Sequence, residues 1–175
     1  MNVKTTAPAL RRGTARLPDV VGLGGALAGL GGGLAMAIVG MLFALALGQD
    51  AWLEPKQIAA VIWGAAAIAH PGFEAWPVLA GTLIHFLTSA VVGAIFGIVT
   101  RRWLHLPSDF GTPVLAGLVY GLLVWLVAYF VALPLVDSFL LGSYAPAFII
   151  QHIVYGVVTG LLYAWLRPAP YNAAD

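Results

Sequence analysis

Three observations predict that this sequence forms an all-α fold, a four-helix transmembrane bundle: its composition, four long uncharged segments and a one-sided distribution of basic residues. Of the 175 residues, 61% are apolar and 9% are charged, and the mean hydropathy is +0.95. A soluble domain carries roughly 25% charged residues, so this chain cannot build a water-compatible surface. Composition therefore excludes a soluble enzyme, a nucleic-acid-binding protein and a disordered tail. The absence of cysteine excludes disulfides and thiolate metal sites.

Four segments are long enough to cross a bilayer. A hydrocarbon core about 30 Å thick takes roughly 20 apolar helical residues, and each segment is free of Asp, Glu, Lys and Arg. Pro77, Pro113 and Pro146 lie near the expected first turns, where a missing N–H is tolerated. The predicted spans are residues 22–47, 78–100, 113–135 and 147–166, within one domain, residues 22–168.

Basic residues fall almost entirely on one side of this arrangement. Lys56 lies in the long loop after the first span, and the others lie on the opposite side: Lys4, Arg11, Arg12, Arg16, Arg101, Arg102 and Arg167. Basic residues near span ends favour the cytoplasmic face. The basic N-terminal segment 1–21 and the tail 169–175 are therefore expected in the cytoplasm.

The long loop between the first two spans contains a further apolar run, residues 57–69. A run of this length is too short to cross the membrane and is interfacial, re-entrant or buried. Because unwound backbone inside the membrane needs a cavity to satisfy it, a short interfacial helix packed on the bundle is favoured over a re-entrant segment.

An internal repeat relates the two halves of the chain. The motif Leu-Ala-Gly-Leu begins at Leu27 in the first span and at Leu115 in the third, and a glycine follows three residues after each motif, Gly33 and Gly121. Each half is then a helical hairpin that enters the membrane in the same direction. Parallel repeats of this kind are related by an axis along the membrane normal.

Small residues recur four positions apart, and so on one helix face, in the predicted spans. Lipid provides no hydrophobic drive for helix association, so close approach over small residues has to bring transmembrane helices together. The residues expected at these helix–helix contacts are Gly25, Gly29, Gly33, Ser89, Gly93, Gly97, Gly117, Gly121, Gly156 and Gly160.

Two histidines lie on these small-residue faces. His85 and His152 are both expected roughly 8–11 Å below the same membrane surface, from the rise of 1.5 Å per helical residue. They occupy equivalent helices of the two halves. If these helices are diagonal in the bundle, both imidazoles face inward.

Four explanations of the histidine pair remain open. A structural role, in which each imidazole bonds a carbonyl or hydroxyl across a helix crossing, is favoured. The pair could instead provide the axial ligands of a haem b, or bind a quinone or relay protons. A Zn or Cu site would use His85 and His152 together with His70 and Glu74 of the loop.

Several motifs resemble a known family. They are Glu54-Pro55-x-Gln57, His70-Pro71-Gly72-Phe73, His85-x-x-x-Ser89-x-x-x-Gly93 and His152-x-x-Tyr155-Gly156-x-x-x-Gly160. From about residue 22 onward the chain resembles the four-span inner-membrane proteins of bacteria of the YagU type. The resemblance implies a multi-pass protein of the bacterial inner membrane without an assigned reaction, and it transfers no catalytic or binding residue.

The sequence favours a non-catalytic role. Abundant packing surface and few polar groups inside the spans are typical of an accessory or assembly subunit of a larger inner-membrane complex, such as a respiratory one. The expected partners are the lipid bilayer and other membrane subunits or further copies of the chain, and no nucleic acid. The alternatives are an electron-transfer protein that binds haem b, quinone or metal at His85 and His152, and a small-solute transporter or channel.

Overall fold

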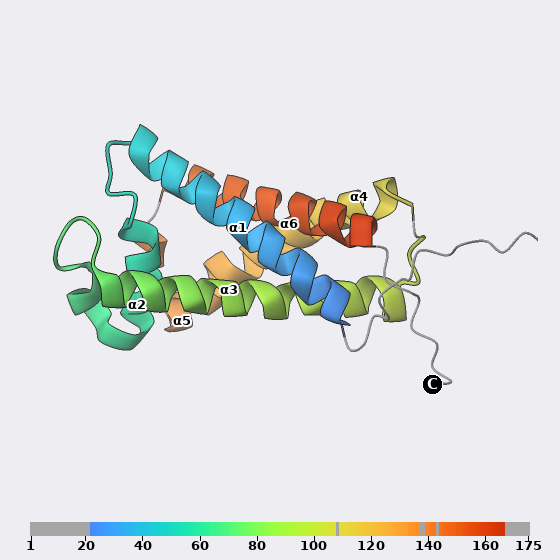
Figure 1. Cartoon of the computed structure of the whole chain (residues 1–175), viewed down its shortest axis with the longest axis horizontal. Helices are drawn as coiled ribbons and strands as arrows, with labels where there is room; N and C mark the ends of the chain where they lie inside the picture. The colour runs from blue at the N-terminus through green and yellow to red at the C-terminus, as the bar shows by residue number, and fades with distance from the viewer. Residues whose placement is uncertain (1–21, 108, 137–138, 143, 167–175) are drawn as a thin grey trace, which may run out of the picture.

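A computed structural model describes residues 22–107, 109–136, 139–142 and 144–166. The predicted cytoplasmic segments 1–21 and 169–175 lie outside the described residues. The described residues form helices and connecting loops without a β-strand. Four of the helices are long and apolar enough to cross a membrane, so the chain is an all-α four-helix transmembrane bundle (Figure 1).

The four spans agree with the predicted ones to within a few residues at most of their ends. They are α1 (Leu23–Ala46), α3 (Ala75–Ile98), α4 (Gly111–Val127) and α6 (Ala145–Leu166). Two of them continue through a π-helical turn, Val99–Trp103 after α3 and Ala128–Ala132 after α4, and the second turn leads into the short helix α5 (Leu133–Val136). A π turn adds a residue to the helical turn and so rotates the side chains that follow it.

The apolar run in the long loop forms a helix that differs from the predicted one. Helix α2 spans Leu53–Trp63, so it begins four residues before position 57, and Gly64–Ile68 continues as a 3-10 helix. Gly64 adopts φ of 58°, a left-handed conformation that ends an α-helix and that glycine adopts most readily. Helix α2 lies across one end of the bundle and packs against α3 (Figure 1). We call this end of the bundle the α2 end.

On helix α1, small residues face the interior of the bundle and large ones face outward. The buried residues of α1 are Gly25, Ala28, Gly29, Gly32, Gly33, Gly40 and Ala44. The same helix exposes Leu23, Leu27, Leu30, Leu34, Ile38, Leu42 and Leu45. An exposed apolar face of this extent would be unstable in water, but it matches lipid tails in a bilayer.

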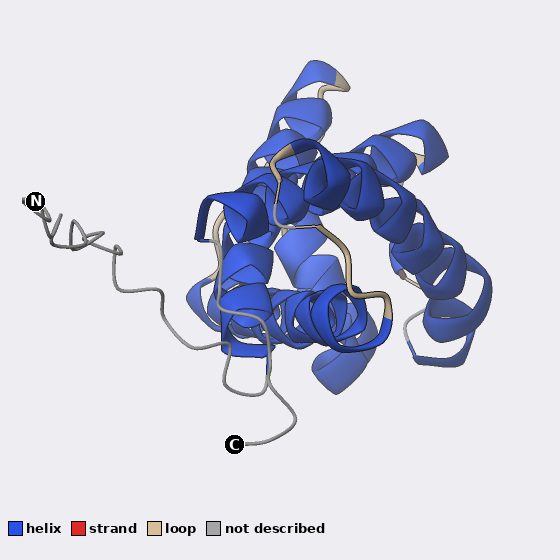
Figure 2. Ribbon diagram, turned by 90° about the vertical axis from the view of Figure 1, so that its right-hand side faces the viewer, coloured by secondary structure: helices blue, strands red, loops and turns tan. Residues whose placement is uncertain are grey.

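The spans pack as an open ring in the order α3, α1, α6, α4. Neighbours along this order pack closely, whereas α3 and α4 make little backbone contact with each other in the described part of the chain. Figure 2 views the arrangement from the end at which α1 begins and α6 ends. Helices α3 and α6, which carry the two intramembrane histidines, are therefore diagonal.

The two hairpins cross over matching glycines, as the internal repeat implies. A Cβ added to Gly29 of α1 would collide with the carbonyl oxygen of Ser89 and lie 2.7 Å from Cα of Gly93 in α3. In the second hairpin, a Cβ on Gly117 of α4 would collide with the carbonyl oxygen of Gly156 in α6. The structure places the other predicted packing residues at these same two crossings: Gly25, Gly33, Gly97, Gly121 and Gly160. Only glycine allows such close backbone approach.

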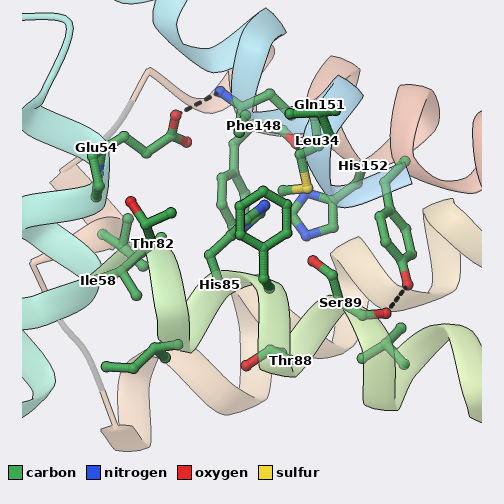
Figure 3. Close-up of a pocket in the computed structure, with 18 of the residues that line it drawn as sticks. Leu34, Glu54, Ile58, Thr82, His85, Thr88, Ser89, Phe148, Gln151 and His152 are labelled. Carbon is green, nitrogen blue, oxygen red and sulfur yellow. Dashed lines mark hydrogen bonds between the residues drawn. The ribbon is translucent and has the colours of Figure 1, made fainter. Parts of the chain in front are cut away.

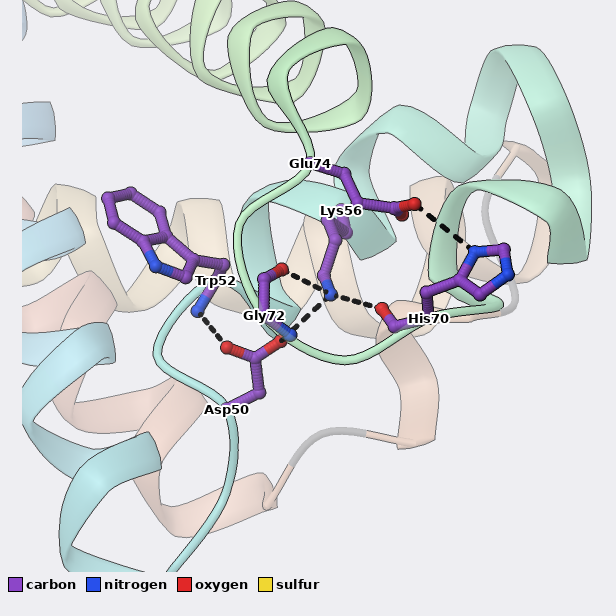
Figure 4. A network of polar contacts seen from close by, with 6 residues as sticks. All are labelled: Asp50, Trp52, Lys56, His70, Gly72 and Glu74. Atoms are coloured by element: carbon purple, nitrogen blue, oxygen red, sulfur yellow. Dashed lines mark hydrogen bonds and ion pairs between the residues drawn. The ribbon is translucent and has the colours of Figure 1, made fainter.

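Lys56 of α2 connects the segment before this helix to the loop that follows it, through an ion pair and hydrogen bonds (Figure 4). The Lys56 ammonium, whose side chain is 1% exposed, donates hydrogen bonds to Asp50 Oδ2 at 2.8 Å and to the carbonyl oxygens of His70 and Gly72 at 2.8 and 3.0 Å. Asp50 also accepts hydrogen bonds from the backbone N–H groups of Trp52 and Gly72. Burial raises the pKa of Asp50, but the hydrogen bonds from Lys56 and the two N–H groups outweigh it and leave the pKa below its usual value. We call this set of contacts the Lys56 latch.

Candidate functional site

A cavity of about 590 Å³ lies inside the half of the bundle nearest the α2 end. Its walls come from α1, α2, α3 and α6, and α4 and α5 contribute Val124, Leu133 and Val136. Most of the lining is apolar. A volume of 300–1,000 Å³ with apolar walls and a few convergent polar groups is typical of a small-molecule site.

The cavity reaches the outer surface of the bundle, and the residues that line it include exposed ones on α1, α3 and α5. Thr88 of α3 and Val136 of α5 line the cavity, and both are exposed on the surface of the bundle. Farther from the α2 end, Tyr120 of α4 bridges the space between α4 and α3. Its hydroxyl donates to the carbonyl oxygen of Val92 at 2.8 Å, and its ring lies 5.2 Å from that of Phe96. In a membrane the opening would therefore face lipid tails.

His85 and His152 line this one cavity, although they come from diagonal helices (Figure 3). The distance from His85 Nε2 to the carbonyl oxygen of Gly33 is 2.9 Å, and that from His152 Nδ1 to the carbonyl oxygen of Phe148 is 2.8 Å. A carbonyl oxygen only accepts, so the bonded nitrogen carries the proton. In each neutral ring the other nitrogen, Nδ1 of His85 and Nε2 of His152, keeps a lone pair.

A carboxyl–amide pair adds to the polar part of the cavity wall. Gln151 Nε2 donates to Glu54 Oε2 at 3.4 Å, and both residues line the cavity (Figure 3). Gly40 of α1 makes room for this pair, because a Cβ there would collide with Glu54 Oε2. Gln151 is 4% exposed, and its Oε1 is buried without a hydrogen-bond partner among the described residues. Burial raises the pKa of Glu54 to about 7, against the lowering effect of the Gln151 hydrogen bond.

The predicted four-residue metal set is not assembled. His70 is 75% exposed and pairs through Nδ1 with Glu74 Oε1 at 3.1 Å on the loop, and neither residue lines the cavity with His85 and His152. Among the described residues, no group of three or more His, Asp or Glu side chains is placed to hold a metal ion. The reason is the Lys56 latch, which holds the backbone of residues 70–72 against α2.

A haem b held by both histidines does not fit this geometry. The nitrogen of His85 that points away from the main chain, Nε2, is bonded to Gly33, so only Nδ1, next to Cβ, has a free lone pair. A macrocycle bound through that nitrogen would meet the backbone of its own helix. On the other side of His85, Gly33 of α1 already packs against the Ser89 side chain of α3.

Two residues of the cavity, Gln151 and Glu54, were not among the site residues predicted from the sequence. The sequence could have indicated Gln151, because it is the one amide side chain within the four predicted spans, and an amide in hydrocarbon needs a hydrogen-bond partner. The sequence indicates Glu54 less directly, because this residue lies between the predicted spans and reaches the cavity only through the placement of α2. The glycine that admits it, Gly40, lies seven residues after Gly33 on the same face of α1.

Comparison of the chain with protein-family models, curated proteins and solved structures gave no match.

Proposed function

We propose that this integral membrane protein binds a lipid-soluble small molecule with a hydroxyl-bearing polar head, of the reduced quinone (quinol) type. The observation that supports the proposal is the combination of a 590 Å³ apolar cavity with a cluster of hydrogen-bond acceptors in its wall. Its lateral opening gives a molecule dissolved in the bilayer a direct route of entry.

The acceptor cluster determines which head group fits. The lone pairs of His85 and His152 and the unpartnered Oε1 of Gln151 are all acceptors. A quinol offers two hydroxyl donors, whereas the oxidised quinone offers only acceptors. Buried polar groups left unpaired are expensive, so the cavity should discriminate in favour of the reduced form.

This proposal develops the quinone alternative of the sequence analysis and is compatible with the accessory role. A subunit that holds a lipid-soluble ligand within a larger complex needs packing surface and a pocket, but no catalytic group. We also propose that the α2 end faces away from the cytoplasm. The buried Arg101 and its neighbour Arg102 lie at the opposite end of the bundle, and basic residues near span ends favour the cytoplasmic side.

The test is native mass spectrometry of the protein in nanodiscs, under anaerobic conditions, with decylubiquinol or decylubiquinone. We expect one decylubiquinol per chain and weaker binding of the oxidised probe. His152→Phe should weaken decylubiquinol binding by about 3- to 10-fold, the value of one hydrogen bond. His70→Phe changes an exposed histidine outside the cavity and should bind like the unmodified protein. Equal binding of the two probes, or no effect of His152→Phe, would refute the proposal.

A further inference from the structure

Glu54 lies between the membrane cavity and a second, smaller hollow. This second hollow has a volume of about 50 Å³ and is lined by Glu54 and Gln151 together with residues of α1 and of two loops. Gln49 comes from the loop after α1, and Gly142 and Tyr144 come from the segment before α6. Gly142 and Tyr144 are exposed. The carboxyl–amide pair is therefore the boundary between the bilayer cavity on one side and the surface of the α2 end on the other.

From this position we propose that Glu54 is a proton-exchange site, which takes up and releases protons through the small hollow and presents either a neutral acid or a carboxylate to the cavity. This inference concerns the same cavity as the proposed function, but it does not require that a ligand be bound. The step is a simple transfer: the O–H bond of the acid breaks, and its proton passes to water at the α2 end.

The groups around Glu54 allow both protonation states. Helix α1 faces it with Gly40, which carries no charge. Helix α6 provides the Gln151 amide, whose N–H donates to the carboxyl oxygen in either state. The titratable groups that share a hollow with Glu54 are His85 of α3, His152 and Tyr155 of α6, and Tyr144 of the loop. Lys56 of its own helix is held by Asp50. No cation among these described groups is free to fix Glu54 as a carboxylate.

The environment of Glu54 supports exchange near neutral pH. Desolvation disfavours the carboxylate and raises the pKa of Glu54 to about 7. A buried carboxyl that titrates in this range changes charge with small changes in pH at the α2 end. A ligand hydroxyl donates a stronger hydrogen bond to a carboxylate than to a neutral acid, so proton release at Glu54 would strengthen the binding of a donor ligand.

Two carbodiimides with different solubilities test the proposal on the full chain in nanodiscs without added ligand. Dicyclohexylcarbodiimide partitions into lipid and reacts with protonated carboxyl groups, whereas a water-soluble carbodiimide approaches from the aqueous side. Peptide mass spectrometry then identifies the modified residue. We expect both reagents to modify Glu54, and modification by the lipid-soluble reagent to decrease as the pH rises through about 7.

Two variants serve as controls for the route. Glu54→Gln should lose the adduct on α2, while Glu74, whose side chain is 32% exposed, keeps its reaction with the water-soluble reagent. Gly142→Trp places a large side chain where a Cβ has open space, and it should slow modification by the water-soluble reagent several-fold but leave the lipid-soluble reagent unaffected. A Glu54 that reacts with neither reagent, or whose modification by the lipid-soluble reagent does not vary with pH, would overturn the proposal. Because no ligand is used, a failure of quinol binding would leave this result unchanged.

Discussion

Replacement of Lys56 by methionine tests whether the latch at the α2 end stabilises the fold. Methionine has a similar length and remains apolar, so the change removes the ammonium and leaves little empty space. Three hydrogen bonds are lost, to Asp50 Oδ2 and to the carbonyl oxygens of His70 and Gly72. Asp50 retains two backbone N–H donors, so it is not left without partners.

The expected loss of stability follows from the burial of Lys56 and Asp50. Breaking a fully buried ion pair destabilises a protein by about 3–5 kcal/mol. Lys56 is 1% exposed, but the Asp50 side chain is 20% exposed, and solvent screening reduces the Coulomb part of the loss. With the two carbonyl oxygens partly rehydrated, we expect Lys56→Met to lower the free energy of unfolding by about 2–4 kcal/mol.

Equilibrium unfolding in mild detergent, analysed as a double-mutant cycle with Asp50→Asn, measures the effect. We expect the double variant to be less destabilised than the sum of the two single variants, by about 1–2 kcal/mol, because the two groups act on each other. A Lys56→Met protein within about 0.5 kcal/mol of the unmodified chain, or strictly additive single changes, would show that the latch does not stabilise the fold.

Two further predictions concern the helix contacts. Gly29→Ala should lower the free energy of unfolding by about 1–3 kcal/mol, because its Cβ would collide with the Ser89 carbonyl oxygen. Thermal unfolding measures the change, and Gly142→Ala, at a position with open space, is the matched control. Equal stability of the two variants would contradict the role of Gly29 in helix packing. Tyr155→Phe should lower the free energy of unfolding by about 0.5–1.5 kcal/mol, because it removes the 2.8 Å hydrogen bond to the Ser89 carbonyl oxygen. The same change at the exposed Tyr144 should have no measurable effect. Equal losses of stability at both tyrosines would mean that the hydrogen bond contributes nothing.

The candidate site was predictable where it depends on helix periodicity. His85 and His152 lie inside spans and on small-residue faces, so their shared depth follows from the sequence, and the structure places both at one cavity. The same reasoning failed for His70 and Glu74, because a loop residue has no periodicity to orient it. The Lys56 latch decided where that loop lies, and it holds His70 and Glu74 at the surface as a pair.

The sequence by itself determined the number and approximate limits of the spans and the faces along which they pack. Both properties are local: the solvation of each side chain in lipid sets the spans, and the four-residue spacing of glycines sets the faces. The cavity was decided only by the tertiary structure. It exists because α3 and α4 pack on α1 and α6 and little on each other, and because α2 brings Glu54 to Gln151 across 97 residues of chain. Such long-range pairings depend on how whole helices are placed, which no local pattern of residues specifies.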